Sequence, residues 1–281
     1  MNEHSSISLD GDRRPVAVIA FGGNALLRPQ DHGTQEEQFT LAWKATRWLV
    51  EIIHRGYELA IVHGNGPQVG NIMIQLEEAI TKIPPQSLDV AVAQTQGSMG
   101  YMLANQLRNR FNEEQLEKEI AAVLTEVEVD REDPAFENPT KPVGPYFTAY
   151  RANLLMQEHG WQMVEDAGRG WRKVVASPMP KKILGSHLLK RLVENGAVLV
   201  AGGGGGVPVY QDVGGYFRGV EAVIDKDYVA AMLAAELQAD LFIMLTQVPM
   251  VAENFGRPNQ RWLRRMPLDK AREMMAANQF P

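Results

Sequence analysis

Three glycine-rich turns are the residues of this sequence best suited to binding a multiply charged anion. Each turn directly follows a short apolar run: Gly22, Gly23 and Asn24 follow PVAVIAF, Gly64, Asn65 and Gly66 follow YELAIVH, and Gly202, Gly203, Gly204, Gly205 and Gly206 follow AVLVA. Backbone without side chains lets successive N–H groups surround a phosphate. Because the carboxyl ends of parallel strands meet at one edge of a sheet, the turns predict a single phosphate-binding edge.

The row of five glycines could also be a flexible linker. Each ordered glycine costs roughly 0.5–1 kcal/mol of backbone entropy relative to alanine, so an ordered row needs a reason. Flexible linkers are polar on both sides, whereas apolar residues precede this row and VPVY follows it at once. We therefore interpret the row as a phosphate-binding turn at the end of a buried strand.

One lysine sits where helix stability does not explain it. Lys226, in VIDKDYVAAML, opens a predicted helix, where the positive end of the helix dipole disfavours a cation by roughly 0.3–1 kcal/mol. An incoming phosphate would explain the position, and Asp227 would then hold the lysine in place. The sequence equally allows Asp225 to be an ordinary N-cap, with Lys226 a solvated neighbour and Asp227 a first-turn acid.

A second lysine lies in a segment that breaks the regular pattern. Residues 130–180 are rich in proline and weak in periodicity, which predicts a loop-rich insertion acting as a flap over a site. Lys141, in NPTKPVGP, could be delivered to a phosphoryl group when the flap closes, or it could be an ordinary surface lysine.

Several other chemistries are excluded. The chain has no cysteine, which removes disulfides, thiol nucleophiles and Cys-ligated zinc. It has no P-loop motif, Gly64-x-Gly66 lacks the third glycine of a dinucleotide fingerprint, and the six histidines show no metalloprotease spacing. We expect His63 to be a satisfied histidine at a strand end and no metal site built from protein side chains alone.

The elements that must position these residues alternate along the chain. Apolar runs predict buried strands at 15–21, 57–63, 121–125, 197–201 and 240–246, and helical periodicity predicts helices at 34–55, 89–112, 181–195 and 225–238. Thr34 and Glu37 form a capping box at the first helix. The order predicts βαβ units, and therefore an α/β fold with a mostly parallel sheet covered on both faces.

Bulk properties favour small-molecule partners. The 281 residues carry a net charge of -6 without a basic stripe, which argues against nucleic acid or an anionic membrane as the main partner. The first 14 residues read as a disordered polar tail, and no apolar run is long enough for a signal peptide or membrane span. We expect a cytoplasmic protein.

The sequence resembles the carbamate kinases, a branch of the amino acid kinase family. The resemblance rests on AFGGNA, VHGNGPQVGN, TQGSMGY, DPAFENPTKPVGP, EDAGRGWRKVVASP, GGGGGVPV and GVEAVIDKD, which occur in family order from about residue 16 to 281. It implies a three-layer αβα sandwich in a single domain, residues 15–281, with residues 130–180 protruding and residues 197–281 forming the nucleotide-side lobe. It also implies a homodimer and Mg²⁺-dependent phosphoryl transfer between ATP and carbamate, usually toward ATP from carbamoyl phosphate and ADP.

The resemblance also implies roles for single residues. Gly22, Gly23 and Asn24 would contact the transferred phosphate, while Gly64 to Gly66 and the row from Gly202 to Gly206 would shape the carbamoyl side. Lys226 would bridge phosphates, Asp227 would organise the lysines, and Lys141 matches the mobile lysine of the flap. Carbamate is already an anion, so no general base is needed, and a site of glycines and lysines suits the reaction.

The sequence departs from the family pattern in two places. Family members continue with a Gly-Ser-Met-x-Pro-Lys segment, a helix and closing strands, so this chain is expected to lack a second phosphate lysine and part of its sheet. LTQVPMV places Gln247 and Pro249 where the family has small or acidic residues near the nucleotide. Two alternatives therefore stay open: another acid kinase of the same fold, and a non-catalytic relative that binds nucleotide or carbamoyl phosphate.

Overall fold

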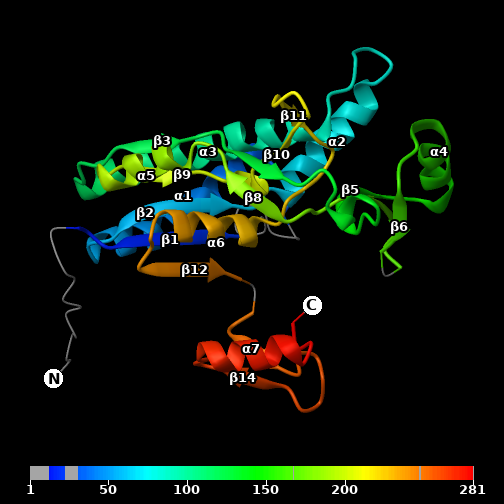
Figure 1. The fold of residues 1–281 in the computed structure, drawn as a ribbon. Coiled ribbons are helices and arrows are strands. Elements are labelled where there is room, and N and C mark those ends of the chain that lie inside the picture. Colours follow the sequence, from blue (N-terminus) through cyan, green and yellow to red (C-terminus); the bar gives the residue numbers. More distant parts are fainter. Residues whose placement is uncertain (1–12, 23–30, 167, 247, 281) are drawn as a thin grey trace. The chain divides into compact units, whose positions relative to one another are not determined.

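The computed structural model describes residues 13–22, 31–166, 168–246 and 248–280 (Figure 1). The chain divides into two compact units, Met1–Met244 and Leu245–Pro281. Within the described ranges, no helix is both long and apolar enough to cross a lipid bilayer.

A five-stranded sheet forms the centre of the first unit. Its strand order is β12-β1-β2-β9-β3, with bounds Leu241–Leu245, Val16–Phe21, Glu58–His63, Val198–Val200 and Ile120–Ala122. β1 pairs with β2, β2 with β9 and β9 with β3, all in parallel. The mostly parallel sheet predicted from the apolar runs is therefore confirmed.

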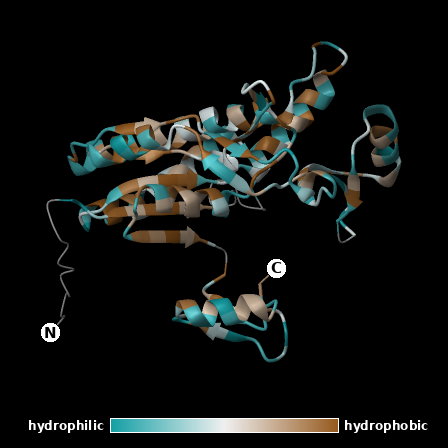
Figure 2. Ribbon diagram, in the orientation of Figure 1, coloured by the Kyte–Doolittle hydropathy of each residue, from teal (hydrophilic) through white to brown (hydrophobic). Residues whose placement is uncertain are grey.

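Helices cover both faces of this sheet. The helices α1 (Gln35–His54) and α3 (Leu88–Glu114) lie on one face, and α5 (Ser186–Glu194) and α6 (Lys226–Glu236) lie on the other. Successive side chains of a strand point to opposite faces. Accordingly, Val16 and Val18 join the core beneath α5 and α6, whereas Ala17 and Ile19 join the core beneath α1 and α3. Figure 2 shows hydrophobic residues concentrated along these strands. The three-layer αβα arrangement is confirmed.

The boundaries of two helices differ from the prediction. The helix expected over 181–195 begins only at Ser186, because Pro180–Ile183 forms the strand β8 and Gly185 separates the two with a φ of 72°. The helix α2 (Gly66–Ala79) was not predicted and starts within the second glycine turn. Pro67 stands in its first turn, where the missing N–H leaves no helical hydrogen bond unmade.

A second sheet lies beside the glycine row. Its order is β11-β10-β4-β8, with β11 at Phe217–Gly219, β10 at Val207–Gln211 and β4 at Glu126–Val129. β10 and β4 are parallel, and the outer strands are antiparallel to them.

The segment expected to be a loop-rich flap contains regular structure. After a short 3-10 turn η2 (Pro134–Phe136), it forms an antiparallel sheet β5-β7-β6 and the helix α4. Their bounds are Lys141–Phe147, Trp171–Val175, Met163–Glu165 and Ala149–His159. We call residues 141–175 the flap subdomain. Its strands are short and interrupted by proline and glycine, which hid their periodicity in the sequence.

The flap subdomain is fixed to the rest of the first unit by charge and by packing. Among the described residues, three ion pairs join it to the body: Lys141 to Asp225, Arg151 to Glu77 and Lys173 to Glu221. In each pair the subdomain supplies the cation. Val143 and Val175 add a small apolar contact with α2 and α3.

The second unit is small. It holds an antiparallel pair, β13 (Val251–Glu253) and β14 (Arg261–Leu263), and the helix α7 (Leu268–Ala276). Glu253 pairs with Arg261 and Lys270, and Asn254 N–H donates to Gln279 Oε1. Pro249 lies in this unit, and Gln247 lies outside the described residues.

Outside the core, Arg13 and Arg14, which the sequence assigns to the polar tail, form ion pairs with Asp240 and Glu58.

Candidate active site

Two of the three glycine turns pack directly against each other. β2 and β9 are parallel neighbours, so the turns that follow them leave the same edge of the sheet. A Cβ atom at Gly203 would lie 2.4 Å from the His63 ring, and one at Gly204 would lie 2.3 Å from the Asn65 side-chain nitrogen. Close packing therefore requires glycine at both positions, whether or not a ligand binds.

Side chains from α3 hold these turns in place. Asn65 Nδ2 donates to Thr95 Oγ1 at 2.8 Å, so the Asn65 side chain points to α3 although the residue is the N-cap of α2. Gln96 exchanges two hydrogen bonds with the backbone of Thr125, and Thr125 Oγ1 accepts from Gly202 N–H at 2.9 Å. The TQGSMGY block thus supports both turns at once.

The glycine row offers two backbone donors. Gly205 and Gly206 N–H donate to the carbonyls of Gly202 and Gly203, which closes the 3-10 turn η3 (Gly203–Gly205) internally. Within the described part of the chain, the N–H groups of Gly203 and Gly204 have no acceptor. Of the two, Gly204 lines the cavity described below, so its N–H is the one that an anion there could use.

Four charged side chains meet at the start of α6. Asp225, Lys226 and Asp227 come from the helix start, and Lys141 comes from the flap subdomain. Asp225 caps the helix by accepting from Asp227 N–H at 2.9 Å, and its other oxygen accepts from Lys141 Nζ at 3.0 Å. Lys226 Nζ lies 2.5 Å from Asp227 Oδ1. The sequence allowed Asp225 to be an N-cap or Asp227 to hold Lys226 in place, and the structure contains both contacts.

The Asp225 carboxylate remains ionised in this setting. Burial acts to raise its pKa, but the hydrogen bonds from Asp227 N–H and Lys141 Nζ outweigh burial and hold the pKa below its usual range. Asp225 thus keeps Lys141 close to Lys226.

These residues line one cavity of about 330 Å³. The predicted site residues that line it are Gly64, Asn65, Gly66, Lys141, Gly204, Lys226 and Asp227. Gly202, Gly203, Gly205 and Gly206 are buried behind it, and Gly22 does not line it. Gly23 and Asn24 lie outside the described residues.

Sequence reasoning missed two charged residues of this cavity. Asp225 was considered only as a helix cap, although it also binds Lys141. Arg172, on β7, lines the cavity and donates from Nε and Nη2 to Gly144 O at 3.2 and 3.1 Å. Arg172 lies in the EDAGRGWRKVV block, which is part of the family resemblance in the sequence. Its place in the same cavity as Lys226 follows only from the fold.

His63 is a buried neutral histidine behind the glycine row. Its side chain is inaccessible, and Nδ1 lies 3.2 Å from Gly64 O. Burial lowers the pKa of His63 to about 4, and the Gly64 contact opposes this only in part. The residue is thus a packing element, as expected, and does not carry charge near neutral pH.

The pKa of His63 predicts a loss of stability in acid. Between about pH 6.5 and pH 4 the unfolded chain binds a proton at this residue and the folded chain does not. The contribution of neutral His63 to the free energy of unfolding is complete above pH 6.5 and falls by about 3 kcal/mol by pH 4. In urea unfolding across this range, His63→Gln should show a shallower pH dependence than the unmodified protein. His187→Gln, at an exposed histidine, should keep the pH dependence of the unmodified protein. An equal pH dependence of stability for all three proteins would contradict the lowered pKa of His63.

A resident metal site is not evident in the described part of the chain. No group of three or more His, Cys, Asp or Glu side chains there is placed to hold an ion. Asp225 and Asp227, the carboxylates of the cavity, are each engaged by a lysine. The cavity can surround an anion with two lysines, an arginine and a backbone amide.

Comparisons with known proteins agree with this chemistry. The amino acid kinase family matches residues 15–280. Carbamate kinase of Pyrococcus horikoshii is 44% identical over 265 residues, covering 94% of this chain and 84% of that protein, and carbamate kinase 2 of Enterococcus faecalis is 42% identical over 264 residues, with the same coverage. Carbamate kinase from Giardia lamblia bound to AMP-PNP superposes with a TM-score of 0.88 at 35% identity, covering 95% of this chain and 85% of that one.

Proposed function

Since the chain belongs to the amino acid kinase family and, within it, to the carbamate kinases, we propose that it transfers a phosphoryl group between carbamoyl phosphate and ADP. The observation that carries the proposal is the convergence of Lys141, Lys226 and the Gly64–Gly66 turn on one cavity. The physiological direction proposed is ATP formation. The proposal includes the cytoplasmic location and the homodimer that the sequence resemblance implies.

In this reaction a β-phosphate oxygen of ADP attacks the phosphorus of carbamoyl phosphate. The new P–O bond forms as the bond to the carbamoyl oxygen breaks, and carbamate leaves as an anion. No proton has to be moved, so catalysis consists of positioning and charge neutralisation. This requirement matches a cavity whose carboxylates, Asp225 and Asp227, are each paired with a lysine.

The charged residues divide these tasks. Lys226, held by Asp227, would neutralise the moving phosphoryl group. Lys141 would exchange Asp225 for a phosphate oxygen when substrate is bound. The amide of Gly204 and those of the turns at Gly22–Asn24 and Gly64–Gly66 would position the remaining oxygens.

Mg²⁺ enters the proposal as part of the nucleotide substrate. It would reduce the negative charge on the nucleotide phosphates. This fits a cavity whose own two carboxylates already bind lysines.

The direct test is ATP formation by the purified chain from carbamoyl phosphate, ADP and Mg²⁺, followed by luminescence. Acetyl phosphate, which has the same acyl-phosphate bond without the amide, should be a poor donor, and chelation of Mg²⁺ by EDTA should stop the reaction. ADP binding by calorimetry without any turnover would instead favour the non-catalytic alternative.

A further inference from the structure

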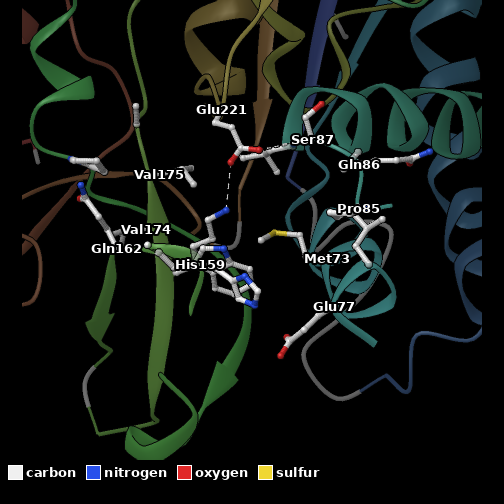
Figure 3. Close-up of a pocket in the computed structure, with 18 of the residues that line it drawn as sticks. Met73, Glu77, Pro85, Gln86, Ser87, His159, Gln162, Val174, Val175 and Glu221 are labelled. Atoms are coloured by element: carbon white, nitrogen blue, oxygen red, sulfur yellow. Dashed lines mark hydrogen bonds and ion pairs between the residues drawn. The ribbon is translucent and has the colours of Figure 1, made fainter. Parts of the chain in front are cut away.

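A second and larger cavity has no lining residue in common with the phosphate cavity. Its volume is about 590 Å³, within the range of small-molecule sites. Figure 3 shows Met73, Pro85 and Ser87 on one side of it and His159 and Gln162 on the other. Most of its wall is apolar, with side chains from α2, from the start of α3 and from the flap subdomain.

The strand β7 contributes neighbouring residues to the two cavities. Arg172 and Lys173 are neighbours on β7 and therefore point to opposite faces of the strand. Arg172 lines the phosphate cavity and Lys173 lines the second cavity. The two cavities are thus distinct, and each has its own cation.

Lys173 is a partly buried cation with two weak contacts. Its side chain is only 13% exposed, and its ammonium group lies 4.7 Å from the centre of the Trp161 ring. The carboxylate that faces it, Glu221, stands 3.3 Å away, longer than the roughly 2.7–2.9 Å of a strong charge-assisted hydrogen bond. An anion at a shorter distance would interact more strongly with this ammonium group.

Glu221 shows that this position accommodates a carboxylate. Oε2 accepts from Lys173 Nζ, the contact drawn as a dashed line in Figure 3, and Oε1 accepts from Leu88 N–H at 3.0 Å. The Glu221 side chain is nevertheless 55% exposed. Its own carboxylate would therefore be hydrated if it moved away from Lys173.

We propose that this cavity binds a small organic carboxylate with an apolar body, whose carboxylate group replaces Glu221 beside Lys173. The body of the ligand would lie against Met73, Leu76 and Trp161, which are cavity residues without charge. Leu88 N–H would provide the second hydrogen bond. This binding site is independent of the phosphoryl-transfer reaction and does not rest on the proposed function.

Calorimetry of the full chain with 3-phenylpropionate tests the site, with 3-phenylpropionamide as a probe of the same shape and no charge. The carboxylate should bind and the amide should bind at least about tenfold more weakly, because a hydrogen bond to a charged group contributes about 1.5–3 kcal/mol. Lys173→Met should weaken carboxylate binding to the same degree. Equal affinities of the two probes would overturn the proposal.

A second variant moves affinity in the opposite direction, which misfolding cannot imitate. Glu221→Gln removes the competing charge and should tighten binding of 3-phenylpropionate by about tenfold. Unchanged or weaker binding to Glu221→Gln, or no binding to either protein, would contradict the site. Lys226→Ala is the control for location: it should leave binding unchanged, and loss of binding would place the probe in the phosphate cavity instead.

Discussion

Replacing Gly205 by alanine is expected to lower the free energy of unfolding by about 4 kcal/mol and to remove most of the kinase activity. An added Cβ would lie 2.2 Å from the carbonyl oxygen of Ile224, a backbone atom that cannot turn aside. Gly205 also has a φ of 92°, which side-chain-bearing residues rarely adopt. Since Ile224 immediately precedes Asp225, the clash would shift the first turn of α6 and both of its lysine contacts.

Gly56 provides the matched control for this substitution. It has a nearly equal φ of 88°, but no atom lies within 4 Å of the Cβ that alanine would add. Gly56→Ala should therefore cost only the conformational strain, about 1 kcal/mol. Chemical denaturation and the ATP-formation assay measure both effects. Equal losses of stability for the two variants would show that the close approach at Gly205 is unimportant.

Lys226→Ala is expected to reduce kcat/KM for ATP formation by about 10³-fold while the protein stays folded. Lys226 and Asp227 form their contact at the surface of the cavity, so truncating the lysine leaves no buried charge. The loss should fall mainly on kcat, because the lysine is proposed to compensate charge that moves during transfer.

Lys182→Ala is the corresponding control. Lys182 is an exposed residue of β8 that does not line the phosphate cavity, and its removal should leave the rate unchanged. A Lys226→Ala protein with native far-ultraviolet circular dichroism and unreduced kcat would exclude Lys226 from the proposed role.

The sequence predicted the central part of the fold well because buried parallel strands carry a strong signal. β1, β2 and β9 are continuous apolar runs, and the capping box of Thr34 and Glu37 marked the start of α1, where both of its hydrogen bonds are present. β8 was mistaken for a helix start, because PKKI has neither a strand alternation nor an apolar run. Its strand conformation depends on pairing with β4, which is distant in sequence.

For the candidate site, sequence identified residue types but not partners. The glycines were proposed from their positions after strands, Lys226 from its position at a helix start, and Lys141 from its place between prolines in the flap segment. The contact of Lys141 with Asp225 joins residues 84 positions apart, and nothing local indicates it. The packing role of the glycine row was missed for the same reason, because His63 and Asn65 approach it only through the pairing of β2 with β9.

The arrangement of the three ion pairs at the flap subdomain makes its attachment sensitive to ionic strength. In these three pairs the subdomain supplies the cations and the body the carboxylates. All three attractions therefore hold the subdomain to the body. Dissolved salt shortens the range of such forces, from about 10 Å at 0.1 M to about 3 Å at 1 M. Arg151 and Lys141 are partly exposed and lose attraction first. We therefore expect the attachment of the flap subdomain to the body to weaken as the ionic strength rises.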